Sequence, residues 1–264
     1  MKLVLPITAA LMFSLSFSLV AFQRGGRRQQ SYDNYGSFAP SEFYFSRLQF
    51  NSLYGGGGFG GGSWEQDWPK ADNDCLIALR RLTRINSPSQ LNVADLDSDH
   101  LFDYPWIYSI NPQTWSFTDA EAKRLHDYLM KGGFLMVDHF HGTEDWDRFM
   151  SGIRQVLPDA QVEDLKDNDE IYHTLYNIDE RFQIPGEQYV RSGITYECGG
   201  GNNCGYVAKW RAIRNAHGRI MVAICHNMHL GDAWEHSDEA SYPEKFSGLA
   251  FRIVLNYITY AMTH

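Results

Sequence analysis

Two short apolar runs, each followed directly by polar residues, are the clearest features of the hydrophobic pattern. The first covers residues 134–137 and the second residues 220–224, and each is typical of a strand buried on both faces. The polar residues after the first run are Asp138, His139 and His141, and those after the second include His226, Asn227 and Asp232. Because open α/β sheets bind ligands at the carboxyl ends of their strands, the pattern predicts a site there.

An amphipathic helix is predicted directly before the first buried run. Thr118 and Glu121 fit a capping box, apolar residues recur on one face of the stretch that follows, and Gly132 and Gly133 end it. A strand over residues 106–109 precedes this helix. Strand, helix and strand in this order form a βαβ unit, which implies a parallel pair with a right-handed crossover. The sequence therefore predicts an α/β fold.

Further elements are predicted along the rest of the chain. Helices are expected over residues 75–82 with Asn73 or Asp74 as the cap, over 145–156, and after Pro243. Strands are expected within residues 43–50 and at 91–93, and residues 194–197 and 206–210 are expected to pair as a hairpin. Residues 164–169 and the stretch around Gly231 are predicted to be loops.

The first 22 residues are mostly apolar after a basic start at Lys2. This order is typical of a secretory signal peptide, and an uncleaved anchor is the alternative, because the run is about long enough to span a bilayer. Residues 23–40 are polar and predict a flexible linker, so one α/β domain is expected over residues 41–264. The pattern predicts export to the periplasm or the cell exterior, with membrane contact only through the N-terminal segment.

Composition narrows the functional classes. The chain has 264 residues and a formal net charge of -9, and this acidic balance argues against nucleic acid as a partner. Export would permit disulfides, and Cys198 and Cys204 flank a glycine-rich loop that a bridge can close. Two free thiols are the alternative.

The histidines after the first buried run are candidate metal ligands. Asp138, His139 and His141 form an Asp-His-x-His string. Histidine and carboxylate side chains suit zinc and related transition metals, so His139, His141 and His226 are candidates for a divalent metal site. The alternative is a polar strand end whose imidazoles form hydrogen bonds with the backbone.

The strand ends also predict a binding cleft. Parallel strands end at one edge, so Asp138 and Asp232 are expected together, with Asp138 accepting hydrogen bonds from loop amides or from Asn227. Trp234 can stack on a sugar ring while carboxylates bind its hydroxyls; alternatively, it lies in the core and Asp232 caps a helix. The predicted cleft comprises Asp72, Asp138, His139, His141, Asn227, Asp232, Trp234 and Glu235.

Several enzyme classes lack their motifs in this chain. The glycine run at residues 55–62 is not followed by Gly-Lys-Ser or Gly-Lys-Thr, which disfavours a nucleotide-binding P-loop. Zinc proteases need His-Glu-x-x-His, whereas His226 and His229 are only three positions apart and have no glutamate between them. A Gly-x-Ser-x-Gly elbow is also missing, which disfavours an esterase.

Short motifs occur in a characteristic order along residues 41–262. They are residues 43–45, 47–49, 71–73, 102–105, 117–118, 132–138 and 231–235. This order resembles the DUF4159 family, a bacterial domain of unknown function. The family is similar to the class I glutamine amidotransferase superfamily, which implies a flavodoxin-like three-layer sandwich with a mostly parallel sheet. Enzymes of that superfamily carry a nucleophilic cysteine on a tight turn after a strand. Neither Asp138 nor Cys225 has that context, so amidotransferase activity does not carry over.

Three functional hypotheses follow. The first is an exported domain on an amidotransferase-like scaffold that binds a small ligand or an envelope protein without catalysis. The second is a metal- or carboxylate-dependent hydrolase that uses Asp138, His139, His141, Asn227 and Asp232. The third is a structural component of an envelope assembly, with the aromatic strand at residues 43–50 as its partner edge.

Overall fold

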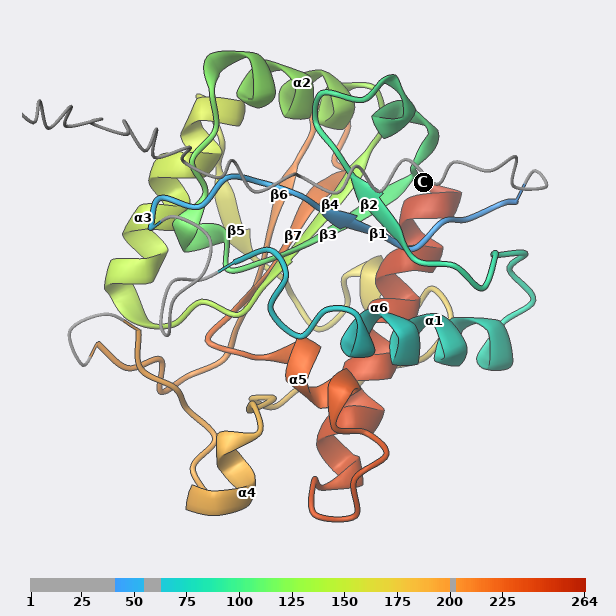
Figure 1. The fold of residues 1–264 in the computed structure, drawn as a ribbon, viewed down its shortest axis with the longest axis vertical. Helices are drawn as coiled ribbons and strands as arrows, with labels where there is room; N and C mark the ends of the chain where they lie inside the picture. The colour runs from blue at the N-terminus through green and yellow to red at the C-terminus, as the bar shows by residue number, and fades with distance from the viewer. Residues whose placement is uncertain (1–40, 55–62, 200–202) are drawn as a thin grey trace, which may run out of the picture. The chain divides into compact units, whose positions relative to one another are not determined.

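Seven strands form one sheet at the centre of the part of the chain that this computed structural model describes, residues 41–54, 63–199 and 203–264 (Figure 1). The strands are β1 (Ser46–Leu48), β2 (Asn92–Ala94), β3 (Trp106–Ile110), β4 (Phe134–Asp138), β5 (Val162–Asp164), β6 (Lys209–Arg214) and β7 (Ile220–His226). Their order is β2-β1-β3-β4-β7-β6-β5. Strand β6 is antiparallel to both β5 and β7, and the other neighbouring strands pair in parallel. The predicted α/β fold with a mostly parallel sheet is confirmed.

Helices cover both faces of the sheet. The helices are α1 (Lys70–Leu82), α2 (Asp119–Met130), α3 (Gly142–Val156), α4 (Gln188–Ser192), α5 (Leu230–Glu235) and α6 (Glu244–Thr263), with short 3-10 turns at Asp99–Asp103, Pro112–Thr114 and Glu170–Tyr172. Figure 1 shows α2 and α3 on one side of the sheet and α1, α5 and α6 on the other. A separate cluster of buried apolar side chains joins each helical layer to the sheet, so the fold has three layers.

The predicted βαβ unit is confirmed as β3, α2 and β4. The capping box forms, because the Thr118 side chain accepts from the N–H of Glu121 and the Glu121 carboxylate accepts from the N–H of Thr118. Gly132, at φ 104°, takes the chain out of the helix. Strand β4 then pairs in parallel with β3, with Trp106 opposite Phe134. Local capping chemistry and the apolar run therefore give this unit its limits.

Some predicted elements are wrong in the structure. Helix α1 begins at Lys70 rather than beside the expected caps, and α3 begins at Gly142 rather than at residue 145. The predicted hairpin is replaced by an isolated bridge between Cys198 and Cys204, because β6 pairs with β5 and β7 instead. Two expected loops contain structure: β5 ends at Asp164, and α5 includes Gly231. Tertiary pairing overrode the local signal in each of these strands.

The aromatic strand predicted as a partner edge is internal. Strand β1 pairs with β2 on one side and with β3 on the other, and Phe43 and Phe45 beside it are fully buried. It therefore offers no free edge to another chain. The proposed signal or anchor, the linker and the glycine run at 55–62 lie outside the described residues. Within the described residues, no helix combines the length and apolar character needed to cross a bilayer.

Candidate functional site

The carboxyl ends of three neighbouring strands carry residues in the left-handed backbone region. Asn111 follows β3 with φ 53°, His139 follows β4 with φ 59°, and Asn227 follows β7 with φ 65°. Asp67, in the loop before α1, has φ 61°. Such conformations cost about 1–3 kcal/mol per non-glycine residue and concentrate at functional sites. The backbone is thus strained at the edge where the sequence predicts a site.

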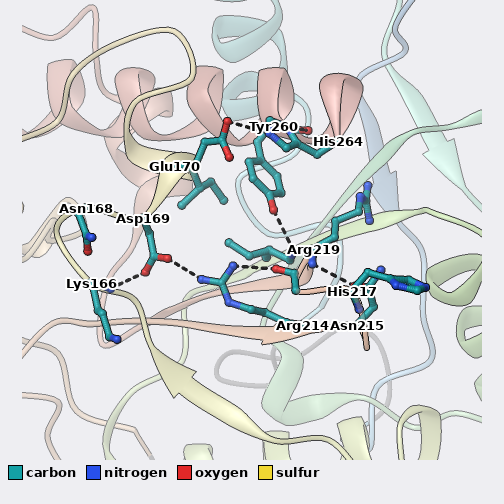
Figure 2. Close-up of a pocket in the computed structure, with 13 residues that line it drawn as sticks. Lys166, Asn168, Asp169, Glu170, Arg214, Asn215, His217, Arg219, Tyr260 and His264 are labelled. Atoms are coloured by element: carbon teal, nitrogen blue, oxygen red, sulfur yellow. Dashed lines mark hydrogen bonds and ion pairs between the residues drawn. The ribbon is translucent and has the colours of Figure 1, made fainter.

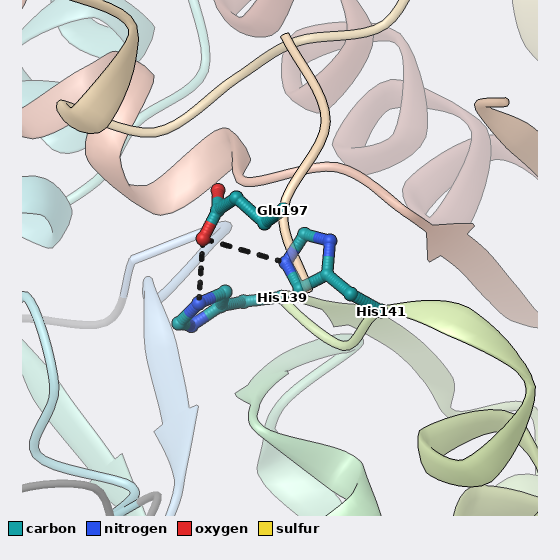
Figure 3. A group of neighbouring side chains, drawn as sticks. All are labelled: His139, His141 and Glu197. Atoms are coloured by element: carbon teal, nitrogen blue, oxygen red, sulfur yellow. Dashed lines mark ion pairs between the residues drawn. The ribbon is translucent and has the colours of Figure 1, made fainter. Parts of the chain in front are cut away.

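His139 and His141 converge on one carboxylate at this edge. Figure 3 shows both imidazoles beside Glu197, with their Nε2 atoms 3.7 Å and 3.8 Å from its Oε2. His141 is 5% exposed, and neither of its ring nitrogens has a hydrogen-bond partner among the described residues. Each of the three side chains offers a ligand atom, and these atoms lie within 4.8 Å of one another. Two imidazoles and one carboxylate are a donor set that zinc accepts.

His229 extends this group toward two more carboxylates. Its ring stacks on the ring of His139, with centroids 3.5 Å apart and planes inclined by 7°. Its Nε2 lies 2.9 Å from Oδ2 of Asp67. Its Nδ1 lies 3.3 Å from Oδ2 of Asp232 and 3.4 Å from Oε1 of Glu197. His229 is buried, so these side chains form one continuous polar cluster.

Asp138 anchors the loop that carries His229. Its side chain is fully buried, and Oδ2 accepts hydrogen bonds from the N–H groups of Leu230 (2.7 Å) and Gly231 (3.1 Å). The hydroxyl of Tyr108 donates to the same oxygen over 3.2 Å. The prediction that loop amides donate to Asp138 is confirmed. Asp138 thereby fixes the start of α5, the helix that carries Asp232.

Asn227 joins two loops rather than donating to Asp138. Its Oδ1 accepts from the N–H of Gly142 (2.9 Å), and its Nδ2 donates to the carbonyl of Val207 (2.7 Å). The left-handed backbone of Asn227 aims the amide at both partners. Its side chain therefore orders the loops around the cluster.

A buried ion pair holds the loop that carries Asp67. The guanidinium of Arg47 lies 2.5 Å from Oδ2 of Asp72, and its Nε donates to Oδ1 over 3.2 Å. Both side chains are fully buried. Arg47 also donates to the carbonyls of Trp64 (3.2 Å) and Gln66 (2.8 Å). Asp72, predicted as a cleft residue, instead fixes the segment that leads into Asp67.

A disulfide lies beside Glu197. Cys198 and Cys204 are bonded to each other, and the N–H of Gly205 donates to the carbonyl of Glu197 over 2.8 Å. The N–H of Gly186 donates to Oε1 of Glu197 over 3.2 Å. The N–H of Gly186 therefore holds the carboxylate, and the bond from Gly205 fixes the backbone of Glu197 beside the disulfide.

The charges of the cluster are shifted by burial and by close partners. Burial would raise the pKa of Glu197, but its contacts with His139 and His229 lower that pKa far below its usual range. Burial lowers the pKa of His141 to about 3, so this ring is neutral at pH 7 and keeps a lone pair. Burial opposes the charge on His229, but the neighbouring carboxylates outweigh it and raise its pKa well above the ordinary value.

The remaining predicted residues have other contacts. Trp234 has no exposed surface and packs on the ring of Tyr108, so it belongs to the core and does not offer a face for a sugar. Nε2 of His226 donates to the carbonyl of Gly142 over 2.9 Å, and its ring lies against Phe140. His226 therefore contacts the backbone, in line with the alternative weighed for the histidines.

Glu235 lies at the margin of the cluster. Burial raises the pKa of its carboxyl, and nearby carboxylates including Asp67 and Asp232 add to this effect. Its backbone carbonyl accepts a hydrogen bond from Lys70. Glu235, Asp232 and His236 also present ligand-capable atoms within 4.8 Å of one another.

The family comparison covers most of the chain. Residues 45–262 match a family described as a domain of unknown function, DUF4159. The chain belongs to the DUF4159 family. No curated protein matches it. The resemblance inferred from the order of motifs is thus confirmed at the level of the family, and the function has to be argued from the site.

Three residues central to the site of this DUF4159 domain were missing from the predicted set. They are Asp67, Glu197 and His229. His229 had a usable signal, because it follows the second buried run in the same string as His226. Asp67 and Glu197 lie in irregular segments far from the strand ends, and only the tertiary fold brings them to the histidines.

A pocket of ≈ 720 Å³ lies at the opposite edge of the sheet of the DUF4159 domain, near the start of β7 (Figure 2). Several of its charged groups have partners within the protein. Arg214 lies 2.6 Å from Asp169, and His264 lies 3.0 Å from Glu170. Arg219 donates to the carbonyl of Gly132 over 2.7 Å. These contacts stabilise the β6–β7 turn and the end of α6, and they leave the histidine cluster as the stronger candidate site.

Proposed function

We propose that this DUF4159 domain binds a divalent transition metal ion through His139, His141 and Glu197, and that it acts as a metal-dependent hydrolase. One observation carries the proposal. Two imidazole Nε2 atoms converge on one carboxylate oxygen, and one of these rings is almost fully buried with neither nitrogen hydrogen-bonded among the described residues. Buried polar nitrogens without partners are rare, and a bound ion is among their explanations.

The distances favour a metal over direct hydrogen bonds. Hydrogen bonds of nitrogen to oxygen span about 2.7–3.2 Å. The contacts of His139 and His141 with Glu197 span 3.7 Å and 3.8 Å. Ligand atoms at the corners of a tetrahedron with bonds of 2.0–2.2 Å to zinc lie about 3.3–3.6 Å apart. The spacing is therefore closer to that of ligands around an ion than to that of donors and acceptors.

The number of donors supports catalysis over a purely structural ion. Structural zinc sites usually have four protein ligands, whereas catalytic sites have three and keep a position for water. Here two histidines and one glutamate converge, and the side chains of His139 and Glu197 remain 14% and 20% exposed. A bound ion would supply a water molecule of lowered pKa as the nucleophile. His139, His141 and Glu197 would hold that ion, and Asp138 and Asn227 would keep the loops in place.

Fold family and location are part of the proposal. The order β2-β1-β3-β4-β7 of the parallel strands supports a flavodoxin-like sandwich related to class I glutamine amidotransferases. Cys225 cannot serve as their nucleophile, because it is buried within β7 and burial raises the pKa of its thiol.

The disulfide and the apolar N-terminal run support export to an oxidising compartment. Sequencing the N-terminus of the protein from its native host tests this, and a cytoplasmic chain that retains Met1 would contradict it.

Titration of the chelator-treated protein with Co²⁺ tests the metal site directly, because the visible absorption spectrum of bound Co²⁺ depends on its ligands. Wild-type protein should bind the ion, and His141→Ala should weaken binding by more than about 100-fold, since even supporting residues are worth 10–100-fold. His226→Gln keeps a donor for Gly142 and should bind as wild type does. Absence of binding, or equal affinity in His141→Ala, would contradict the proposal.

An assay of turnover distinguishes the hydrolase hypothesis from the hypothesis of a ligand-binding domain without catalysis. The probes are p-nitrophenyl acetate and p-nitrophenyl phosphate, assayed with Zn²⁺-loaded and chelator-treated protein. The hydrolase proposal predicts metal-dependent release of p-nitrophenol that His141→Ala abolishes. Metal binding without hydrolysis of either probe would contradict catalysis on these ester classes and favour ligand binding.

A further inference from the structure

The stacked rings of His139 and His229 define two ligand positions rather than one. Their centroids are 3.5 Å apart and their planes are inclined by only 7°. The lone pair of an imidazole nitrogen lies in the plane of the ring, so an ion bound to either ring lies close to that plane. An ion shared by two parallel, stacked rings would lie well outside both planes. Each ring would therefore bind an ion at a position of its own.

Glu197 faces both positions with different oxygens. Its Oε2 lies 3.7 Å from Nε2 of His139, and its Oε1 lies 3.4 Å from Nδ1 of His229. A carboxylate that presents one oxygen to each of two ligand groups has the arrangement of a bridge between two ions. Ions in two-metal sites lie about 3.5–4 Å apart, which is close to the separation of the stacked rings.

The second position has its own ligands. Nδ1 of His229 lies 3.3 Å from Oδ2 of Asp232. Two ligand atoms of a tetrahedral zinc ion are separated by a similar distance, about 3.3–3.6 Å. His229 is 3% exposed, and its Nδ1 has no hydrogen-bond partner within the described segments. This buried nitrogen thus faces two carboxylate oxygens, one from Asp232 and one from Glu197.

Supporting contacts orient these donors as in metal sites. Oδ2 of Asp67 lies 2.9 Å from Nε2 of His229 and accepts a hydrogen bond from it. This leaves Nδ1 to face Glu197 and Asp232. The N–H of Glu187 donates to Oδ2 of Asp232 over 2.7 Å. Metal-bound histidines and carboxylates are commonly held by such outer partners.

The charge of the cluster also favours a second cation. Three carboxylates lie around the buried ring of His229, those of Asp67, Glu197 and Asp232. The nearby guanidinium of Arg47 is already paired with Asp72. Buried carboxylates are costly unless cations compensate them. One ion at the first position would compensate Glu197, whereas the ion pairs of Asp232 and Asp67 among the described residues are with His229.

We propose that His229, Asp232 and Glu197 bind a second divalent metal ion, so that Glu197 bridges a two-metal centre and Asp67 positions His229. This inference rests on the proposed function, because the first ion is the one held by His139, His141 and Glu197. Zn²⁺ and Mn²⁺ fit the mixed imidazole and carboxylate donors of the second position.

The number of bound ions tests the second position. Chelator-treated full-length protein is saturated with Zn²⁺ and analysed by native mass spectrometry, with thermal melting of the metal-free proteins as a folding control. Wild type should bind two ions, and Asp232→Asn should bind one. The control is Asp238→Asn, which alters an exposed carboxylate beyond α5 and should still bind two ions. Mn²⁺ should give the spin-coupled resonance spectrum of a bridged pair in wild type and the spectrum of an isolated ion in Asp232→Asn.

The outcomes separate the two proposals. One ion in wild type that is unchanged in Asp232→Asn and lost in His141→Ala would overturn the second site and keep the first. If wild type binds one ion and both His139→Ala and His229→Ala lose it, the two histidines share a single ion. That result would overturn the proposed pair of ions. Two uncoupled Mn²⁺ ions would overturn the Glu197 bridge. Absence of any ion in wild type would overturn the proposed function itself.

Discussion

Asp138 is the residue on which the geometry of the His229 loop depends most. One carboxylate oxygen accepts from two backbone N–H groups and from the hydroxyl of Tyr108. In Asp138→Ala these buried donors lose their acceptor, at about 1–3 kcal/mol each. We expect the free energy of unfolding in urea to fall by at least about 2 kcal/mol.

Asp138→Asn keeps the shape and an acceptor oxygen, so it should lose much less stability than Asp138→Ala. Metal affinity should fall in both variants in proportion to the disturbance of the loop. Unchanged stability with abolished metal binding would instead make Asp138 a direct ligand.

His226 predicts a dependence of stability on pH. Burial lowers the pKa of this histidine from 6.5 to about 4. For a base whose pKa is lowered in the folded state, stability is fully present above the unfolded pKa and is lost as pH falls toward the folded pKa. The free energy of unfolding should therefore fall between pH 6.5 and pH 4, and this residue should contribute up to about 3 kcal/mol of the loss.

His226→Gln removes this titration and retains a donor for the carbonyl of Gly142. Urea unfolding across this pH range should show a shallower slope in the variant than in wild type. Asp138 acts in the opposite direction, because burial raises its pKa to about 6. Equal slopes in wild type and His226→Gln would contradict the account of the buried ring.

At the residue scale, the sequence predicted the parts of the site that follow a strand. Asp138, His139 and His141 were placed at a strand end because an apolar run precedes them. The roles of Asp67 and Glu197 depend on contacts far along the chain, to His229 and to His139. Nothing in the local pattern of hydrophobic and polar residues encodes such contacts.

Among the elements, the disulfide loop is the one that directly follows Glu197 in the chain. The loop between Cys198 and Cys204 is short, so the bond should contribute about 2 kcal/mol to stability by restricting the unfolded chain. We expect the double substitution Cys198→Ser and Cys204→Ser to lower the melting temperature modestly. The larger effect should be on the metal, with affinity lowered about tenfold or more.

The control for this substitution is Cys75→Ser, which removes a buried free thiol far along the chain from the loop. That variant can lose stability but should keep its metal affinity. Full affinity in the double serine variant would show that Glu197 is positioned without the disulfide.

The elements that could be predicted are those that local chemistry determines. The capping box and the paired glycines set the limits of α2, and the apolar run identified β4 as buried. Strand β5 and the pairing of β6 could not be read in this way, because neither is fixed by its own sequence. Lys209–Arg214 becomes a strand between β5 and β7 only when the sheet is complete.

At the scale of the whole molecule, the order of the strands creates the site. Strands β4 and β7 are distant in the chain but adjacent in the sheet, so the residues after them meet. The sequence indicated that both strands end at one edge. Their adjacency, and the arrival of the Asp67 and Glu197 loops beside them, follow from packing of the complete fold.

Anomalous X-ray diffraction at the zinc edge, from crystals of the Zn²⁺-loaded full-length protein, is the most direct test of the central claim. The account predicts an anomalous peak within bonding distance of Nε2 of His139, Nε2 of His141 and Oε2 of Glu197. It also predicts a second peak beside His229 and Asp232. A map with no peak at His141, in a crystal whose loops keep the arrangement described above, would contradict the account.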